Sequence, residues 1–181
     1  FVHDGAVELY HDNVKKIETI SSGVLLPDRS TNTGRLAFGD FGTRIIESKD
    51  VIGDGSTADL SGHGTHVACT VLGDGTRGPY AGVAPAAELY FQAMENDNTG
   101  NLVSPSLNYL FNDAYGKGAR IHTNSWGSSQ TSDQGKYTSE SEDVDDRANY
   151  YDRFYNNVEG LSILFASGND GSGSGTVNSP G

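Results

Sequence analysis

The stretch SGHGTHVACTVLG, residues 61–73, is the part of this 181-residue chain around which the rest is organised. Its first two glycines, Gly62 and Gly64, permit tight backbone turns and the close approach of another chain segment. The apolar residues after them recur at helical spacing, and Gly73 is a stop signal. The pattern predicts a loop that leads into a short helix.

Two histidines, His63 and His66, lie at the entrance to this helix. A histidine held there by a rigid element suits a general base, because its unperturbed pKa is near neutrality. The two residues could also form a metal pair, although the zinc pattern His-Glu-x-x-His is absent. A histidine between glycines is often an ordinary loop residue. From this stretch alone, all three interpretations stay open.

Two later stretches are also motif-like: NSWG at 124–127 and FASGND at 165–170. HGTHVA at 63–68 resembles the histidine motif of subtilisin-like serine proteases, the subtilases. NSWG resembles the substrate-binding segment of that family, and FASGND resembles the segment that ends in the oxyanion asparagine. The resemblance covers roughly residues 44–181. Within it, GARIHTNSWG at 118–127 is most similar to the oxidatively stable alkaline-protease branch.

The resemblance implies a serine endopeptidase with His63 as general base and Asn169 as the side-chain donor to the oxyanion. It also implies a set of residues that bind the substrate backbone: Ser125, Trp126, Gly127, Ala166, Ser167 and Gly168. Apart from the family, Asn169 is typical of a turn and Trp126 of a core. Two alternatives from other classes are a subtilase-like binding module without catalysis and a metal-dependent hydrolase that uses both histidines.

Two members of the family's triad have no matching motif in these 181 residues. Since no Gly-Thr-Ser-Met-Ala-like motif is present, we expect the nucleophilic serine beyond Gly181. The Asp-Thr-Gly or Asp-Ser-Gly triplet is missing too, so we expect the aspartate before Phe1. Asp28, 35 residues before His63, is the second candidate, although Arg-Ser is the wrong sequel. Residues 1–181 are then a partial catalytic domain, inactive alone, with 1–43 an insertion or variable region.

The composition narrows the classes of partner. The net charge of −12 argues against a nucleic-acid partner, which requires a basic face. No stretch approaches the roughly 18 apolar residues of a membrane span. The single cysteine, Cys69, is expected to be a small apolar filler on its helix, with a reactive thiol as the alternative. The resemblance implies polypeptide substrates, an extracellular location and no cofactor for catalysis.

Strands are expected at 88–94, 119–124 and 161–166, and residues 43–51 could form an edge strand. They alternate with helical patterns, which is typical of parallel α/β folds. Ligands bind beyond the carboxyl ends of such strands, where Ser125 and Asn169 follow, and the helix of His63 can start at the same rim. The predicted fold is a subtilisin-like α/β domain, a parallel sheet flanked by helices in three layers, incomplete at both ends.

Two further helices are expected between these strands. Ser104 is the expected N-cap of the first, with Pro105 at its first position, and its buried stripe is Leu107, Leu110, Phe111 and Ala114. The second is expected to end at Gly160 and to bury Val144, Ala148, Tyr151, Tyr155 and Val158.

Two acidic segments are interpreted as solvated structure. The aspartates of loop 50–61 are typical turn formers, with a structural calcium site as the alternative. The acidic cluster at 140–146 suits a helix N-terminus and a solvated face, in preference to a metal site.

Overall fold

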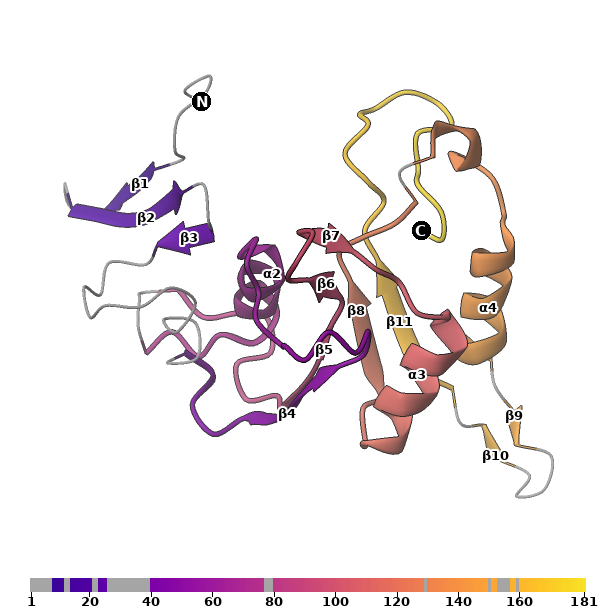
Figure 1. The fold of residues 1–181 in the computed structure, drawn as a ribbon, viewed down its shortest axis with the longest axis horizontal. Coiled ribbons are helices and arrows are strands. Elements are labelled where there is room, and N and C mark those ends of the chain that lie inside the picture. Colours follow the sequence, from indigo (N-terminus) through magenta and orange to yellow (C-terminus); the bar gives the residue numbers. More distant parts are fainter. Residues whose placement is uncertain are drawn as a thin grey trace. The chain divides into compact units, whose positions relative to one another are not determined.

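The computed structural model describes residues 8–11, 14–20, 23–25, 40–76, 80–128, 130–149, 151–152, 157–158 and 160–181 (Figure 1). The chain divides into two compact units, Phe1–Val103 and Ser104–Gly181, and each is described by itself. Each unit contains a pair of parallel strands and helices, so the predicted α/β class is confirmed. The three-layer arrangement of a whole domain stays a prediction.

Unit 1 begins with a small antiparallel sheet of three strands, in the order β1-β2-β3 (Figure 1). Its members are β1 (Glu8–His11), β2 (Val14–Ile20) and β3 (Gly23–Leu25). The candidate Asp28 falls among residues 26–39, outside the described residues. The proposal that 1–43 is an insertion therefore stays a prediction.

The parallel pair of unit 1 joins β4 (Ile45–Asp50) to β5 (Leu89–Ala93), close to the bounds predicted from the sequence. Their register runs from Ile45 opposite Leu89 to Asp50 opposite Ala93. Helix α2 (His63–Leu72) lies between them in the chain, as predicted. A short hairpin of β6 (Glu95–Asn96) and β7 (Asn101–Leu102) follows β5.

The core of unit 1 joins the C-terminal half of α2 to the turn before β4. Phe41 and Leu72 are both buried, and Cys69 packs against them with other partly buried apolar side chains. Burial raises the pKa of the Cys69 thiol to about 11, with the nearby charge of Asp40 adding to the effect. Cys69 is thus a packed, protonated thiol at neutral pH, which favours the filler interpretation.

The end of α2 is closed by the segment around Gly82. A helix leaves its last four carbonyls without helical partners, and three of these accept bonds from later backbone N–H groups: Gly73 to Cys69, Val83 to Thr70 and Ala84 to Val71. The segment approaches so closely that a Cβ on Gly82 would lie 2.7 Å from the Leu72 nitrogen. Glycine is therefore required there by packing.

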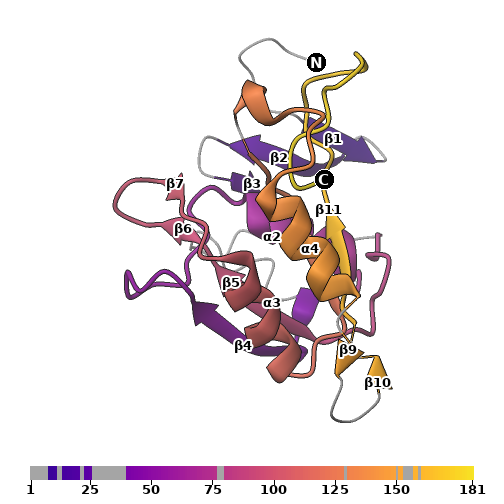
Figure 2. The same ribbon diagram turned by 90° about the vertical axis from the view of Figure 1, so that its right-hand side faces the viewer.

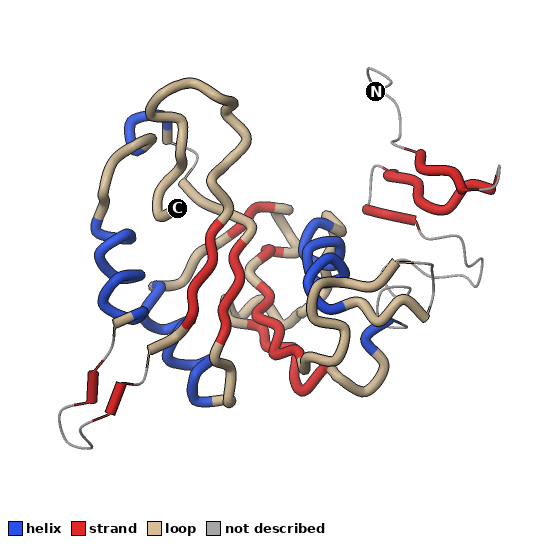
Figure 3. The backbone as a smooth tube through the Cα atoms, turned by 180° about the vertical axis from the view of Figure 1, so that it is seen from behind, coloured by secondary structure: helices blue, strands red, loops and turns tan. Residues whose placement is uncertain are grey.

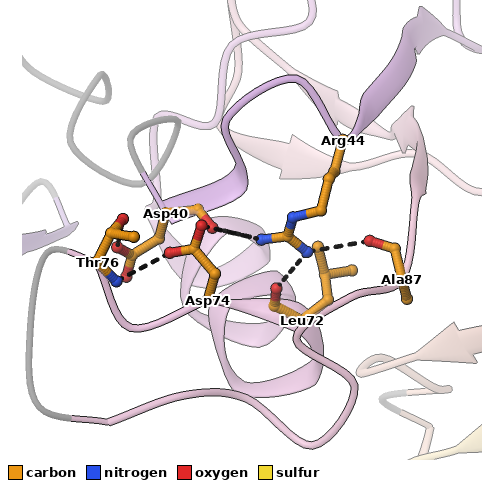
Figure 4. Close-up of polar contacts among 6 residues, drawn as sticks. All are labelled: Asp40, Arg44, Leu72, Asp74, Thr76 and Ala87. Atoms are coloured by element: carbon orange, nitrogen blue, oxygen red, sulfur yellow. Dashed lines mark hydrogen bonds and ion pairs between the residues drawn. The ribbon is translucent and has the colours of Figure 1, made fainter.

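Arg44 supplies the partner of the fourth carbonyl (Figure 4). Its Nη1 donates to the Leu72 oxygen at 2.7 Å and to the Ala87 oxygen at 3.0 Å. Its Nη2 lies 3.8 Å from an Asp74 carboxylate oxygen. A cation at a helix C-terminus is favourable with the helix dipole. Arg44 therefore fixes the far end of the helix that begins at His63.

Unit 2 is built on the parallel pair β8 (Ile121–Asn124) and β11 (Ser162–Phe165), with Ser162 opposite Ile121 and Phe165 opposite Asn124. Helices α3 (Leu107–Gly116) and α4 (Ser139–Ala148) lie side by side next to it (Figures 1 and 2). The short 3-10 helix η1 (Thr131–Asp133) precedes α4. Burial alternates along β11, and Leu164 is exposed, although the parallel strands of α/β folds are usually covered on both faces.

The predicted buried stripe of α3 is confirmed, because Leu107, Leu110, Phe111 and Ala114 are all buried. The predicted N-cap was two residues early. Ser106 is the cap, and its hydroxyl accepts a hydrogen bond from the Tyr109 N–H at 3.2 Å. The hydroxyl of Ser104 instead donates to the Pro105 carbonyl.

The predicted length of the second helix was wrong. Helix α4 starts with a capping box between Thr138 and Ser141 and ends at Ala148. Tyr151 and Val158, predicted on its buried stripe, instead pair with each other in the antiparallel strands β9 (Tyr151–Asp152) and β10 (Asn157–Val158). The segment is rich in aromatic residues, which favour strands, so its helical spacing was misleading. Tyr155 falls outside the described residues.

The tube view shows the same elements from behind (Figure 3). In the part of the chain that the structure describes, each helix is too short or too polar to cross a membrane.

Candidate active site

We call residues 50–65 together with 95–97 the histidine edge. Strand β4 ends at Asp50 and β5 ends at Ala93, and the two strands are parallel, so the histidine edge lies at their carboxyl ends. His63 is the first residue of α2, as its motif predicted, and its side chain is exposed. An exposed imidazole on a rigid helix end can reach a bound substrate.

The free backbone N–H groups at the start of α2 are capped by side chains of the loop that precedes the helix. Its N-cap, Gly62, has φ +72° and offers no side chain. Asp59 takes this role: its Oδ1 accepts from the Gly62 N–H at 2.9 Å and its Oδ2 from the Thr65 N–H at 2.6 Å. The Ser61 hydroxyl accepts from the His63 N–H and donates to Asp59. A carboxylate at a helix N-terminus is stabilising.

A second carboxylate reaches this loop from the turn after β5. Oε2 of Glu95 accepts hydrogen bonds from the N–H groups of Leu60 at 3.0 Å and Ser61 at 3.2 Å. In return, Oδ2 of Asp54 accepts from the Asp97 N–H at 2.9 Å. The two loops are thus bonded in both directions. Glu95 was not predicted from the sequence, because nothing local in the sequence marks a contact across 35 residues.

The aspartates of loop 50–61 act as turn formers. Asp50 accepts hydrogen bonds from the N–H groups of Ile52, Gly53 and Gly55. These bonds hold the pKa of Asp50 below its usual value, and the bond from Gly55 has the largest effect. Among the described residues, no group of three or more histidine, cysteine, aspartate or glutamate side chains is arranged to hold a metal ion.

We call residues 125–128, 166–170 and 178–181 the asparagine edge. Because β8 and β11 are parallel, Ser125 and Ala166 leave the sheet at the same end. The Ala166 N–H donates to the Asn124 carbonyl at 2.9 Å, and Trp126 packs edge-on against Phe165 with ring centroids 5.2 Å apart. The structure therefore brings the two predicted substrate-binding segments, 125–127 and 166–168, side by side.

A third segment, around Asn178 and Ser179, completes the asparagine edge and was missed by sequence reasoning. The Asn178 N–H donates to the Ser167 carbonyl at 3.0 Å, and the Ser128 N–H donates to the Ser179 carbonyl at 2.8 Å. A Cβ on Gly127 would lie 2.9 Å from the Ser179 oxygen. The available sequence signal was weak, since this stretch looks like a glycine- and serine-rich linker.

Bonds between side chains, to amide, hydroxyl and carboxylate oxygens, also hold this edge together. Nε2 of Gln134 donates to Oδ1 of Asn178 at 3.1 Å and also to Oδ2 of Asp170, the residue next to Asn169. The hydroxyls of Thr138 and Ser179 are hydrogen-bonded to each other. Asn169 itself is exposed.

His122 lies on β8, two residues before the end of the strand. Its ring meets Phe111 of α3 edge-on, with centroids 5.0 Å apart. Burial lowers the pKa of His122 to about 4, against a smaller opposing effect of a hydrogen bond with Asn124. His122 is therefore neutral at pH 7 and belongs to the packing of unit 2.

His63 lies in unit 1, and Asn169 lies in unit 2. Within its own unit, each follows the carboxyl end of a parallel strand pair, as the sequence predicted. That the two residues share one rim stays a prediction.

Comparison with known proteins identifies the class. The subtilase family profile matches residues 24–181, and the chain belongs to this family of serine peptidases. The serine protease/ABC transporter B family protein tagB of Dictyostelium discoideum is 31% identical to it over 116 residues. That match covers 61% of this chain and 6% of the relative, so the chain corresponds to a small part of that protein. No solved structure was found to match this chain.

Proposed function

We propose that residues 1–181 belong to the catalytic domain of a secreted serine endopeptidase, with His63 as general base and Asn169 as oxyanion donor. One observation supports this most. In a chain of the subtilase family, both motif residues follow the carboxyl ends of parallel strands, where α/β sheets bind ligands. Because GARIHTNSWG is similar to the oxidatively stable alkaline-protease branch, the proposal assigns the chain to that branch of the family.

In the proposed reaction, a serine oxygen attacks the scissile carbonyl carbon while His63 takes the serine proton. The carbonyl oxygen becomes an oxyanion, which the side-chain N–H of Asn169 stabilises. The carbon–nitrogen bond then breaks, and His63 gives its proton to the leaving amine. Water hydrolyses the acyl-enzyme by the same steps. The proposal places the serine beyond Gly181 and the orienting aspartate before Phe1, with Asp28 as the second candidate.

The proposed substrate is an extended polypeptide bound along the asparagine edge, between 125–127 and 166–168. Extended peptides pair with exposed backbone as an added strand. No cofactor takes part in the proposed chemistry. The carboxylate oxygens of Asp50, Asp54 and Asp59 accept N–H bonds, as expected of turn formers, and a structural calcium ion at loop 50–61 stays the alternative.

The test is hydrolysis of a chromogenic peptide by the full-length protein that contains these residues. His63→Ala is expected to abolish turnover while folding is retained. His66→Ala, one helical turn away and also exposed, is the matched control and is expected to keep most of the activity. Near-normal turnover by the His63 variant would contradict the proposal, and a parent protein without any hydrolysis would favour the non-catalytic binding module.

A further inference from the structure

The loop that delivers His63 is held by side-chain oxygens rather than by a buried core. Leu60 and Ser61 are exposed, and the exposed fraction of Leu60 is 48%. From residue 60 to residue 63, every backbone N–H donates to a side-chain oxygen, which belongs in turn to Glu95, Glu95, Asp59 and Ser61. With so little apolar burial, these bonds decide where the loop lies.

The acceptors differ in how far they reach. Asp59 and Ser61 belong to the loop itself, and their bonds shape the turn and join it to the first turn of α2 without reaching the sheet. Glu95 follows directly on the buried pair Ala93 and Met94 at the end of β5, so its carboxylate attaches the loop to the sheet. Bonds from N–H groups to a carboxylate are about twice as strong as neutral ones. Among these four bonds, the two to Glu95 are the ones that connect the residues just before His63 to the end of β5.

We infer that Glu95 is a positioning residue for His63: by accepting the Leu60 and Ser61 N–H groups, it sets the place of the imidazole relative to the strand ends. The inference rests on the proposed role of His63 as general base. A displacement of about 1 Å at a catalytic group can cost 10²-fold in rate. Loss of the two bonds to Glu95 should therefore lower kcat more than it changes KM.

The first test compares three Glu95 variants of the full-length enzyme. Glu95→Ala is expected to lower kcat about 10- to 100-fold with KM nearly unchanged. Glu95→Gln keeps an oxygen acceptor at the same reach and is expected to restore most of kcat. Glu95→Asp keeps the charge but is one methylene shorter, so it should restore less than Gln. The exposed Glu88, replaced by Ala, is the matched control and should change nothing.

The second test needs no turnover. Amide hydrogen exchange by NMR is expected to speed up at Leu60 and Ser61 in Glu95→Ala, and the ring signals of His63 should shift or broaden. Unchanged exchange would overturn the inference. So would unchanged kcat, or Asp restoring more activity than Gln, since charge and not position would then matter. If Glu95→Ala does not fold, the order of Gln and Asp decides.

The two proposals can fail separately. Full turnover by His63→Ala would end the proposed function, whatever happens at Glu95. If His63→Ala is inactive while the Glu95 variants behave like the parent, the role of His63 stands and the positioning inference is wrong.

Discussion

The histidine edge and the asparagine edge each hold an exposed loop in place, but their backbone N–H groups donate to different kinds of acceptor. Both lie where a pair of parallel strands ends, and both must hold an exposed loop that carries a candidate catalytic residue. At the histidine edge, the backbone N–H groups donate to carboxylates such as Asp50, Asp59 and Glu95. At the asparagine edge, the backbone N–H groups donate to backbone carbonyls, and the carboxylates of Asp133 and Asp170 accept only from side chains, those of Ser128 and Gln134.

The difference teaches where each edge is sensitive. Carboxylates hold N–H donors strongly while they are ionised, and they suit the positive end of a helix such as α2. Their hold is lost when they are protonated. Backbone carbonyls, amides and hydroxyls do not titrate in acid, and the backbone bonds of the asparagine edge depend instead on close packing of one backbone segment against another, as at Gly127 and Gly181. The predictions below probe this contrast, from the largest effect to the smallest.

The largest effect is expected at the asparagine edge. Asn169→Ala should lower kcat by about 10²–10³, the loss that follows removal of one oxyanion donor in a subtilisin, with KM little changed. The measurement is steady-state hydrolysis of a peptide by the full-length protein, with the exposed Asn98 replaced by Ala as control. A rise in KM alone would make Asn169 a substrate-binding residue instead.

The second effect concerns stability in unit 2. The pKa of His122 is about 4 in the folded chain and near 6.5 when unfolded, so the unfolded state binds the proton more readily. Stability should therefore fall as pH drops from 6.5 toward 4, by at most about 3 kcal/mol. His122→Gln should flatten this part of the curve, measured by denaturant unfolding. Identical pH dependence in both proteins would contradict the assignment.

The third effect concerns the close approach of the segment around Gly82 to the C-terminal end of α2. Gly82→Ala should lower the free energy of unfolding by about 1–3 kcal/mol, because the new Cβ would overlap backbone atoms of the helix. Gly116→Ala, where no neighbour lies within 4 Å and φ is not positive, is the control and should be neutral or stabilising. Equal effects of the two changes would show that the close approach at Gly82 is unimportant.

The smallest effect separates the two edges by pH. Since the pKa of Asp50 is lowered by its N–H donors, its stabilisation is complete above pH 3.8 and is lost as pH falls below that value. Hydrogen-exchange protection of Gly53 and Gly55 should then decrease in acid, while that of Ser128 and Asn178 should persist. Asp50→Asn should show the loss at neutral pH. Parallel loss at both edges would erase the contrast.

Much of the fold could be predicted because its signals are local. The glycine stop at Gly73 and the apolar spacing before it gave α2, and the stripe around Phe111 gave the buried face of α3. The order of the motifs placed His63 and Asn169 at strand ends. These features depend on residues within a few positions of one another.

The rest depends on contacts across long intervals or on competing local preferences. Glu95 and Leu60 are 35 residues apart, and Gln134 and Asn178 are 44 residues apart. No local sequence pattern predicts contacts over such separations. The aromatic stretch after Ala148 matched a helical period, although its residue types favour strands. Helix period and strand preference conflicted there, and preference prevailed.

The central claim is that His63 activates a serine for attack. The most direct measurement is covalent labelling of the full-length protein by a serine-directed phosphonate, followed by mass spectrometry. We predict stoichiometric labelling of one serine beyond Gly181, and its loss in His63→Ala with the fold intact. Labelling of His63→Ala at the parent rate would contradict this claim. Labelling of a serine within residues 1–181 that depends on His63 would support the role of His63 and contradict the expected position of the serine.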